Sequence, residues 1–221
     1  YAHLPEAEQR ERLVKATGIL EDALGSAITL FRAPVFRLSA ATLSILAELG
    51  YVADTSVPST RLSLLSSDMW NTGYLWAPRR PYHPSYRSAF RRGSVGIWEV
   101  PVSCILIPFT VSFLQVFGLQ AMKAYLGVLR MESRITGKPI VYMAHPEDFF
   151  PSRFVHPKWK FGFRQFLPSR THGLAIRYAF RERDEHKIYE RNMAFVGAMA
   201  DEDHLDFKTL GSFVADMDDR V

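Results

Sequence analysis

The first 54 residues alternate between helical and strand patterns, and this alternation is what most restricts the fold. Apolar residues at helical spacing predict one helix over 6–24 and a second from Ser39 to Gly50. The short apolar runs 27–31 and 51–53 are typical of buried strands. Because a helix–strand–helix–strand order favours parallel strands, the sequence predicts an α/β fold.

Beyond this point the pattern is less regular. Residues 66–94 contain several Pro and Gly residues, which predicts a long loop insertion. The sequence then predicts, in order, a strand over 97–103, a helix over 113–136, a strand over 140–144 and a helix over about 182–198. No internal repeat is visible, and the length of 221 residues is compatible with one large domain or two small ones.

Composition excludes several classes of protein. Hydrophobic residues make up 48% and charged residues 23% of the 221, which is typical of a globular chain and not of a disordered or collagen-like one. The net charge of +4 is too small to predict nucleic-acid binding by itself. The one cysteine, Cys104, excludes an intramolecular disulfide and a Cys-based zinc site. The localisation stays open, and a bacterial cell envelope and the cytoplasm are both compatible with the sequence.

A long apolar stretch over 100–119 raises the question of a membrane span. Pro101 and Pro108 interrupt this stretch, and its first half is rich in β-branched residues. We therefore interpret it as a buried strand followed by a helix.

Three polar residues follow predicted strands directly: Arg32, Asp54 and His145. In parallel α/β folds, reacting groups lie just beyond the carboxyl ends of the strands. A His can exchange a proton near neutral pH, an Asp can orient it, and an Arg can hold a carboxylate. Each residue also has a structural interpretation, since His145 can belong to a turn, Asp54 can cap one, and Arg32 can form a surface ion pair.

Several short motifs occur in the order found in a known family. They are Arg-Ala-Pro at 32–34, Gly-Tyr at 50–51, Asp-Thr-Ser at 54–56, Glu-Val-Pro-Val-Ser at 99–103, His-Pro at 145–146 and Phe-Lys-Thr-Leu at 207–210. In order and spacing the chain resembles the polysaccharide deacetylase family, named for the nodulation chitooligosaccharide deacetylase. The resemblance covers nearly the whole chain and implies that residues 1–221 form a single partial domain, the C-terminal two-thirds of the family's domain.

The resemblance implies a distorted (β/α) barrel whose N-terminal part is missing from this chain. It also implies a metal-dependent hydrolase that removes an N-acetyl (N-acyl) group from an amino sugar in a polysaccharide or lipid-linked glycan. His3 fits the second histidine of the family's H-x-x-x-H metal motif, with Zn²⁺ as the expected divalent metal. The other metal ligands and the general base would lie upstream of Tyr1.

The same resemblance implies a role for each candidate residue. Arg32 would hold the upstream Asp base. His145 would protonate the leaving amine, and Asp54 would tune that histidine. The backbone N–H of Val35 would bind the oxyanion, and Trp98 would line the acetate pocket.

Two other functions stay open. The chain departs from the family at Val35-Phe36, where an aromatic residue and Gly are frequent, so the substrate of chitin or peptidoglycan enzymes does not transfer directly. One alternative is a non-catalytic glycan-binding or scaffolding member of the same fold. The other is an amide hydrolase acting on a small nitrogenous molecule.

Residues 70–92 mix aromatic side chains with arginines and contain no acidic residue. Aromatic faces stack on sugar rings, and arginine binds phosphate or carboxylate. This composition favours contact with an anionic glycan, a lipid-linked sugar phosphate or a membrane surface. The alternative is a solvated basic loop whose aromatic residues cover the core. Nucleic acid is not expected, because the excess charge is local.

Overall fold

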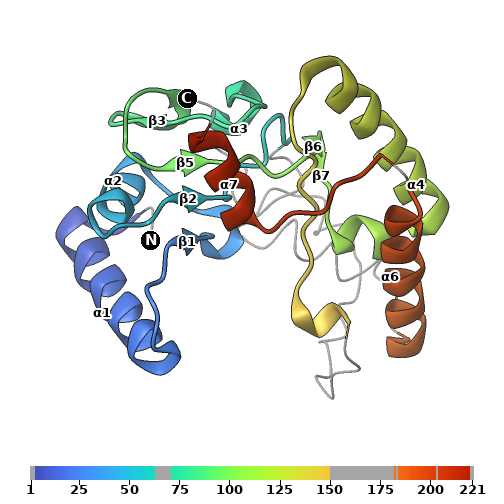
Figure 1. Ribbon diagram of the computed structural model, residues 1–221, viewed down its shortest axis with the longest axis horizontal. Helices are drawn as coiled ribbons and strands as arrows, with labels where there is room; N and C mark the ends of the chain where they lie inside the picture. Colours follow the sequence, from blue (N-terminus) through green and yellow to red (C-terminus); the bar gives the residue numbers. More distant parts are fainter. Residues whose placement is uncertain (1–2, 63–70, 150–181, 183, 203, 220–221) are drawn as a thin grey trace, which may run out of the picture. The chain divides into compact units, whose positions relative to one another are not determined.

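The structure, a computed structural model, describes residues 3–62, 71–149, 182, 184–202 and 204–219 (Figure 1). The chain divides into two compact units. Unit 1 consists of Tyr1–Ser59, Trp76–Pro101 and Phe207–Val221. Unit 2 consists of Thr60–Leu75 and Val102–Asp206. The sequence-based interpretation of the whole chain as one partial domain stays a prediction.

A small parallel sheet lies inside unit 1. Its strands are β1 (Leu30–Phe31), β2 (Ala53–Asp54) and β5 (Trp98–Glu99), in the order β1-β2-β5. Phe31 is opposite Asp54, and Asp54 is opposite Glu99. The parallel strands predicted from the helix–strand rhythm are therefore present in this unit.

Helices cover the sheet of unit 1. The first helix, α1 (Glu6–Leu24), packs on α2 (Ala40–Glu48), and α7 (Leu210–Asp218) lies against β2 (Figure 1). Gly25 ends α1 in the left-handed region at φ 64°, which glycine adopts without strain. Ser39 caps α2, because its side chain accepts a hydrogen bond from the Thr42 N–H. Both predicted helices are thus confirmed.

The described part of the Pro- and Gly-rich insertion contains regular structure. It forms the short helix α3 (Gly73–Trp76) and an antiparallel hairpin of β3 (Pro84–Ser85) and β4 (Ser88–Arg92). Tyr82 anchors the hairpin, because its side chain is buried and its hydroxyl donates to the carbonyl of Ala89 at 2.6 Å. One buried aromatic side chain therefore orders a segment whose composition predicts a loop.

Unit 2 is built around two helices that pack on each other, α4 (Val111–Thr136) and α6 (Glu185–Ala200) (Figure 1). Fully buried side chains between them include Phe109, Leu129 and Phe195. Ahead of α4, the strands β6 (Cys104–Ile105) and β7 (Ile107–Pro108) form a short antiparallel pair.

Two strand predictions are only partly met. The strand expected over 97–103 is limited to β5, and Pro101 follows soon after, where it lacks the N–H that a ladder needs. The segment expected as a strand over 140–144 is extended but forms only one isolated bridge, between Met143 and Thr110. The described strands form one parallel sheet and two antiparallel pairs, so the barrel stays a prediction.

The apolar stretch over 100–119 is divided between β6, β7 and the start of α4. Within the described residues, none of the helices has both the length and the apolar character that crossing a bilayer requires.

The packing of unit 2 makes a testable prediction about stability. Phe109→Ala removes a fully buried ring that contacts Tyr125, Tyr142 and Phe195. We expect the free energy of unfolding to fall by about 3–5 kcal/mol in urea titrations. Phe117→Ala in α4 is the matched control, because Phe117 is 53% exposed and its loss should cost less than about 1 kcal/mol. Equal losses in the two variants would contradict this description of the core.

Candidate functional site

Two carboxyl groups lie side by side in the sheet of unit 1. Asp54 ends β2 and Glu99 ends β5, and the register pairs the two residues directly. Residues paired in register on neighbouring strands project to the same face of a sheet. Both side chains are completely buried, at 0% exposure. Two acids are thus enclosed together at the carboxyl ends of parallel strands.

Hydrogen bonds fix one oxygen of each carboxyl group. The Ser56 hydroxyl donates to Asp54 Oδ1 at 2.6 Å, and the Val57 N–H donates to Glu99 Oε1 at 3.0 Å. In the described part of the chain, no nitrogen or hydroxyl donor reaches Asp54 Oδ2 or Glu99 Oε2. The two carboxyl groups are close enough to hydrogen-bond to each other when one of them is protonated. Such a bond requires a proton on one of them.

Burial determines where that proton lies. Burial raises the pKa of Glu99 well above its ordinary value, and the nearby charge of Asp54 raises it further. Burial also raises the pKa of Asp54, while hydrogen bonds from Glu99 and Ser56 and the charge of Arg32 oppose this rise. We therefore assign the shared proton to Glu99 and the negative charge to Asp54. The pair titrates as one unit.

Arg32 supplies the positive charge beside this pair. It directly follows β1, and its Nε donates to the Thr55 carbonyl at 3.1 Å. Its Nη2 donates to Thr55 Oγ1 at 3.4 Å. Burial lowers the pKa of Arg32, and the negative charge of the Asp54–Glu99 pair, mainly that of Asp54, raises it. A guanidinium stays protonated in proteins, so Arg32 holds a cation at the carboxyl edge of the sheet.

The turn after Arg32 has an unusual backbone. Pro34–Phe36 form one turn of 3₁₀ helix, η1, in which Val35 has φ 51° and Phe36 has φ 61°. A β-branched residue in this left-handed region stores strain of roughly 1–3 kcal/mol. The Ala33 N–H donates to Ser56 Oγ at 2.7 Å, which ties the turn to the acid pair. Val35 is 57% exposed, so the residue stands at an accessible edge.

The structure brings together the sequence-predicted residues Arg32, Val35 and Asp54. Trp98 directly precedes Glu99 in β5, so alternation along the strand directs its side chain to the opposite face of the sheet. The Trp98 ring stacks on His83 with centroids 3.9 Å apart, and its Nε1 donates to Asp218 at 2.8 Å. Its place in an acetate pocket stays a prediction.

The two predicted histidines, His3 and His145, come from other parts of the chain. His145 belongs to unit 2, where it is exposed and precedes the 3₁₀ turn η3 (Pro146–Asp148). Its N–H donates to the side chain of Asp148 at 3.0 Å. Its convergence with Arg32 and Asp54 stays a prediction, because it belongs to the other unit. His3 is an exposed residue ahead of α1.

The zinc site that the family resemblance implies has one expected ligand in this chain, His3. Among the described residues, no group of three or more His, Cys, Asp or Glu side chains is placed to hold a metal ion. With the proton assigned to Glu99, the buried pair presents one negative charge. We derive no reaction step through a metal, and the predicted ligands upstream of Tyr1 stay a prediction.

Sequence reasoning missed Glu99 as a site residue. The strand pattern over 97–103 is apolar apart from Glu99 and Ser103, and an acid inside a buried strand requires a compensating partner. That signal was present in the motif Glu-Val-Pro-Val-Ser at 99–103. The partner was not visible, because it depends on the register between β5 and β2.

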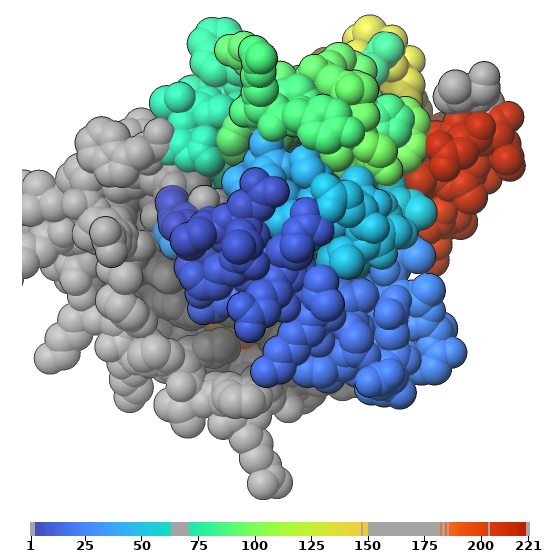
Figure 2. Space-filling model, turned by 90° about the vertical axis from the view of Figure 1, so that its left-hand side faces the viewer, coloured from blue at the N-terminus to red at the C-terminus, as the bar shows by residue number. Residues whose placement is uncertain are grey.

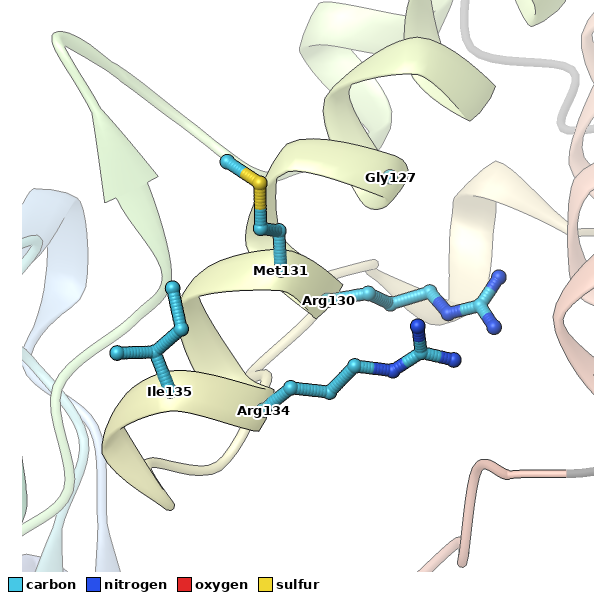
Figure 3. A pocket seen from close by; sticks show the side chains of 5 residues that line it. All are labelled: Gly127, Arg130, Met131, Arg134 and Ile135. Carbon is cyan, nitrogen blue, oxygen red and sulfur yellow. The ribbon is translucent and has the colours of Figure 1, made fainter.

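A separate hollow lies on α4 in unit 2 and has a volume of about 370 Å³ (Figure 3). Its lining residues are Gly127, Arg130, Met131, Arg134 and Ile135. Figure 3 shows the two arginine side chains pointing to one side and those of Met131 and Ile135 to the other. Arg130 is paired with Glu202. None of the predicted site residues lines this hollow, so it gives no support to the predicted chemistry.

Comparison of the chain with protein-family models, curated proteins and solved structures gives no match. The resemblance to the polysaccharide deacetylases therefore depends on the motifs in the sequence alone.

The acid pair makes a prediction about the pH dependence of stability. In Glu99→Gln, Oε1 can still accept from Val57, and the amide can donate to Asp54 without a titrating proton. Because the folded pKa of Glu99 is raised, its contribution is complete below the ordinary Glu pKa of about 4.3 and is lost as pH rises above it. Relative to Glu99→Gln, the wild type should lose about 1.4 kcal/mol of stability per pH unit until the pair ionises.

Urea unfolding at a series of pH values measures this difference. The control is Glu11→Gln, which changes an exposed acid in α1 and should leave the pH dependence of the wild type unchanged. A constant difference between Glu99→Gln and the wild type at every pH would refute the shared proton.

Proposed function

We propose that the protein is a hydrolase that removes an N-acetyl (N-acyl) group from an amino sugar in a polysaccharide or lipid-linked glycan. The observation that carries this proposal is the meeting of Arg32, Asp54 and Glu99 at the carboxyl edge of one parallel sheet. Active sites of parallel α/β proteins lie at this edge. The motifs shared with the polysaccharide deacetylases support the choice of N-acyl hydrolysis.

Amide hydrolysis develops negative charge on the carbonyl oxygen of the acyl group. Stabilising that charge requires fixed donors or cations close to the oxygen. Arg32 and the backbone of Val35 are the groups of the cluster that reach the accessible edge, since both residues are exposed. We assign the oxyanion to the Val35 N–H. Arg32 carries a positive charge that holds a carboxylate of the substrate or the developing oxyanion.

The acid pair acts through its neighbours. Because Asp54 and Glu99 have no exposed surface, neither touches a substrate in this structure, and both are positioning residues. Asp54 contributes the negative charge that favours the cationic form of Arg32, and Ser56 links Asp54 to the turn that carries Val35. In this proposal, His145 protonates the leaving amine, as the resemblance implies.

The non-catalytic alternative is a glycan-binding or scaffolding member of the same fold. That member would keep the fold without releasing acetate. The amide hydrolase alternative differs in its substrates, because small nitrogenous amides would replace amino sugars.

Acetate release by the full-length protein tests the proposal. The substrates are a panel of N-acetylglucosamine oligosaccharides and a panel of small amides. Asp54→Asn keeps an acceptor for Ser56 but removes the charge, so we expect kcat on the oligosaccharides to fall by about 10²-fold or more, with less effect on KM. His145→Ala should lower kcat by a similar factor. Asp22→Asn, an exposed acid in α1, is the control that keeps full activity.

Each alternative predicts a different result in the same assay. If the protein binds the oligosaccharides but releases acetate from none of them, the non-catalytic alternative is established. Release from small amides alone would establish the amide hydrolase. Full activity of Asp54→Asn would remove the acid pair from the reaction even if acetate is released.

A further inference from the structure

Residues 76–97, which lead into β5, expose both arginine and aromatic side chains. Trp76 is 83% exposed and Tyr86 is 66% exposed, and both belong to unit 1. The exposed arginines of the same segment are Arg80, Arg87, Arg91 and Arg92. We call these six residues the arginine surface.

All the exposed charged side chains of this segment are arginines. The sequence contains no acidic residue between Asp68 and Glu99, and Glu99 is completely buried. The four arginines form no ion pair with any acid in the described ranges. Their guanidinium groups are therefore free of described acids and remain available to an anion.

The backbone under this surface is closely packed. Tyr82 ties the hairpin together through the Ala89 carbonyl, and the Gly93 N–H donates to the His83 carbonyl at 2.7 Å. A Cβ atom at Gly93 would lie 2.4 Å from the Cα of Ser85, so only glycine allows the strands to approach this closely. A ligand that binds here therefore meets a preformed hairpin, which reduces the entropy lost on binding.

The segment is continuous on the molecular surface. Figure 2 shows the residues from the end of α3 to β5, coloured teal to green, gathered at the top of this face next to α2. Both strands of the hairpin pack against α2.

We propose that the arginine surface binds an anionic glycan, one whose sugars carry carboxylate or phosphate groups. This inference deepens the proposed function, on which it rests for the identity of the substrate. Arginine forks bind carboxylate and phosphate in a bidentate manner. The exposed faces of Trp76 and Tyr86 offer flat apolar surfaces on which sugar rings stack.

The composition of the surface favours a glycan over a membrane. In Trp76–Pro101, the exposed large hydrophobic residues among those described are Trp76 and Tyr86, both aromatic. Membrane-binding surfaces add aliphatic side chains that enter the lipid, and this segment exposes none. Nucleic acid is less favoured, because the net charge of the whole chain is only +4.

Direct binding measurements on the full-length protein test the inference. Polygalacturonate is the carboxylate probe, phosphomannan is the phosphate probe, and dextran is the neutral control, all at one ionic strength. Isothermal titration should show that Arg87→Ala/Arg91→Ala binds one or both anionic probes at least about tenfold more weakly than the wild type. Lys15→Ala/Lys123→Ala removes the same charge from exposed helix positions elsewhere and should bind within about twofold of the wild type.

A further variant separates fork geometry from charge. Arg87→Lys/Arg91→Lys keeps both charges but loses the planar guanidinium, so its affinity should lie between those of the wild type and the alanine variant. Unchanged affinity in Arg87→Ala/Arg91→Ala, an equal loss in Lys15→Ala/Lys123→Ala, or equal binding of dextran would overturn the inference. Stronger binding to oligothymidylate or to phosphatidylserine vesicles than to either glycan would assign the surface to nucleic acid or membrane instead.

The binding readout does not depend on hydrolysis. Asp54→Asn should bind the anionic probes as the wild type does, because Asp54 is buried in the sheet and is not part of the arginine surface. Arginine-dependent binding without acetate release would remove the proposed function and leave the surface assigned. Acetate release with no arginine-dependent binding would do the reverse.

Discussion

The in-register pairing of β2 with β5 determines the chemistry of unit 1. It places Asp54 beside Glu99 with no solvent around either carboxyl group. Two buried anions this close repel each other strongly, so the pair keeps one proton and one negative charge. A shift of β5 by one residue would exchange Glu99 for Trp98 on this face of the sheet. The site therefore depends on a register as much as on its residues.

The remaining interactions of the site balance that single charge. Arg32 lies next to the pair and carries one positive charge, so the enclosed group is close to neutral overall. Ser56 accepts from the Ala33 N–H and donates to Asp54, which couples the turn after β1 to the acid on β2. Movement of the strained turn at Val35 would disturb this chain of hydrogen bonds. Strain that persists in such a network is typical of functional positions.

Local patterns predicted part of this arrangement. Helix periodicity located α1 and α2, and the positions after apolar runs identified Arg32 and Asp54, because both signals are short in range. The role of Glu99 depends on pairing between strands about 45 residues apart, which no local pattern contains. The Pro and Gly content around residues 84–92 predicted a loop. The chain forms a hairpin there instead, which the buried Tyr82 anchors. The positive φ of Val35 carries no sequence signal, since the residue is β-branched.

The acid pair and the hairpin that carries the arginine surface are connected by one antiparallel β-bridge. Tyr82, which anchors the hairpin, exchanges two backbone hydrogen bonds with Glu99, at 3.1 and 2.8 Å. The hairpin that carries the arginines is therefore bonded to the same residue that holds the shared proton. A glycan bound along the hairpin would be held near the carboxyl edge of the sheet, since these two hydrogen bonds join the start of the hairpin to Glu99. Fixed placement of this kind lets binding energy distant from a scissile bond contribute to orientation at that bond.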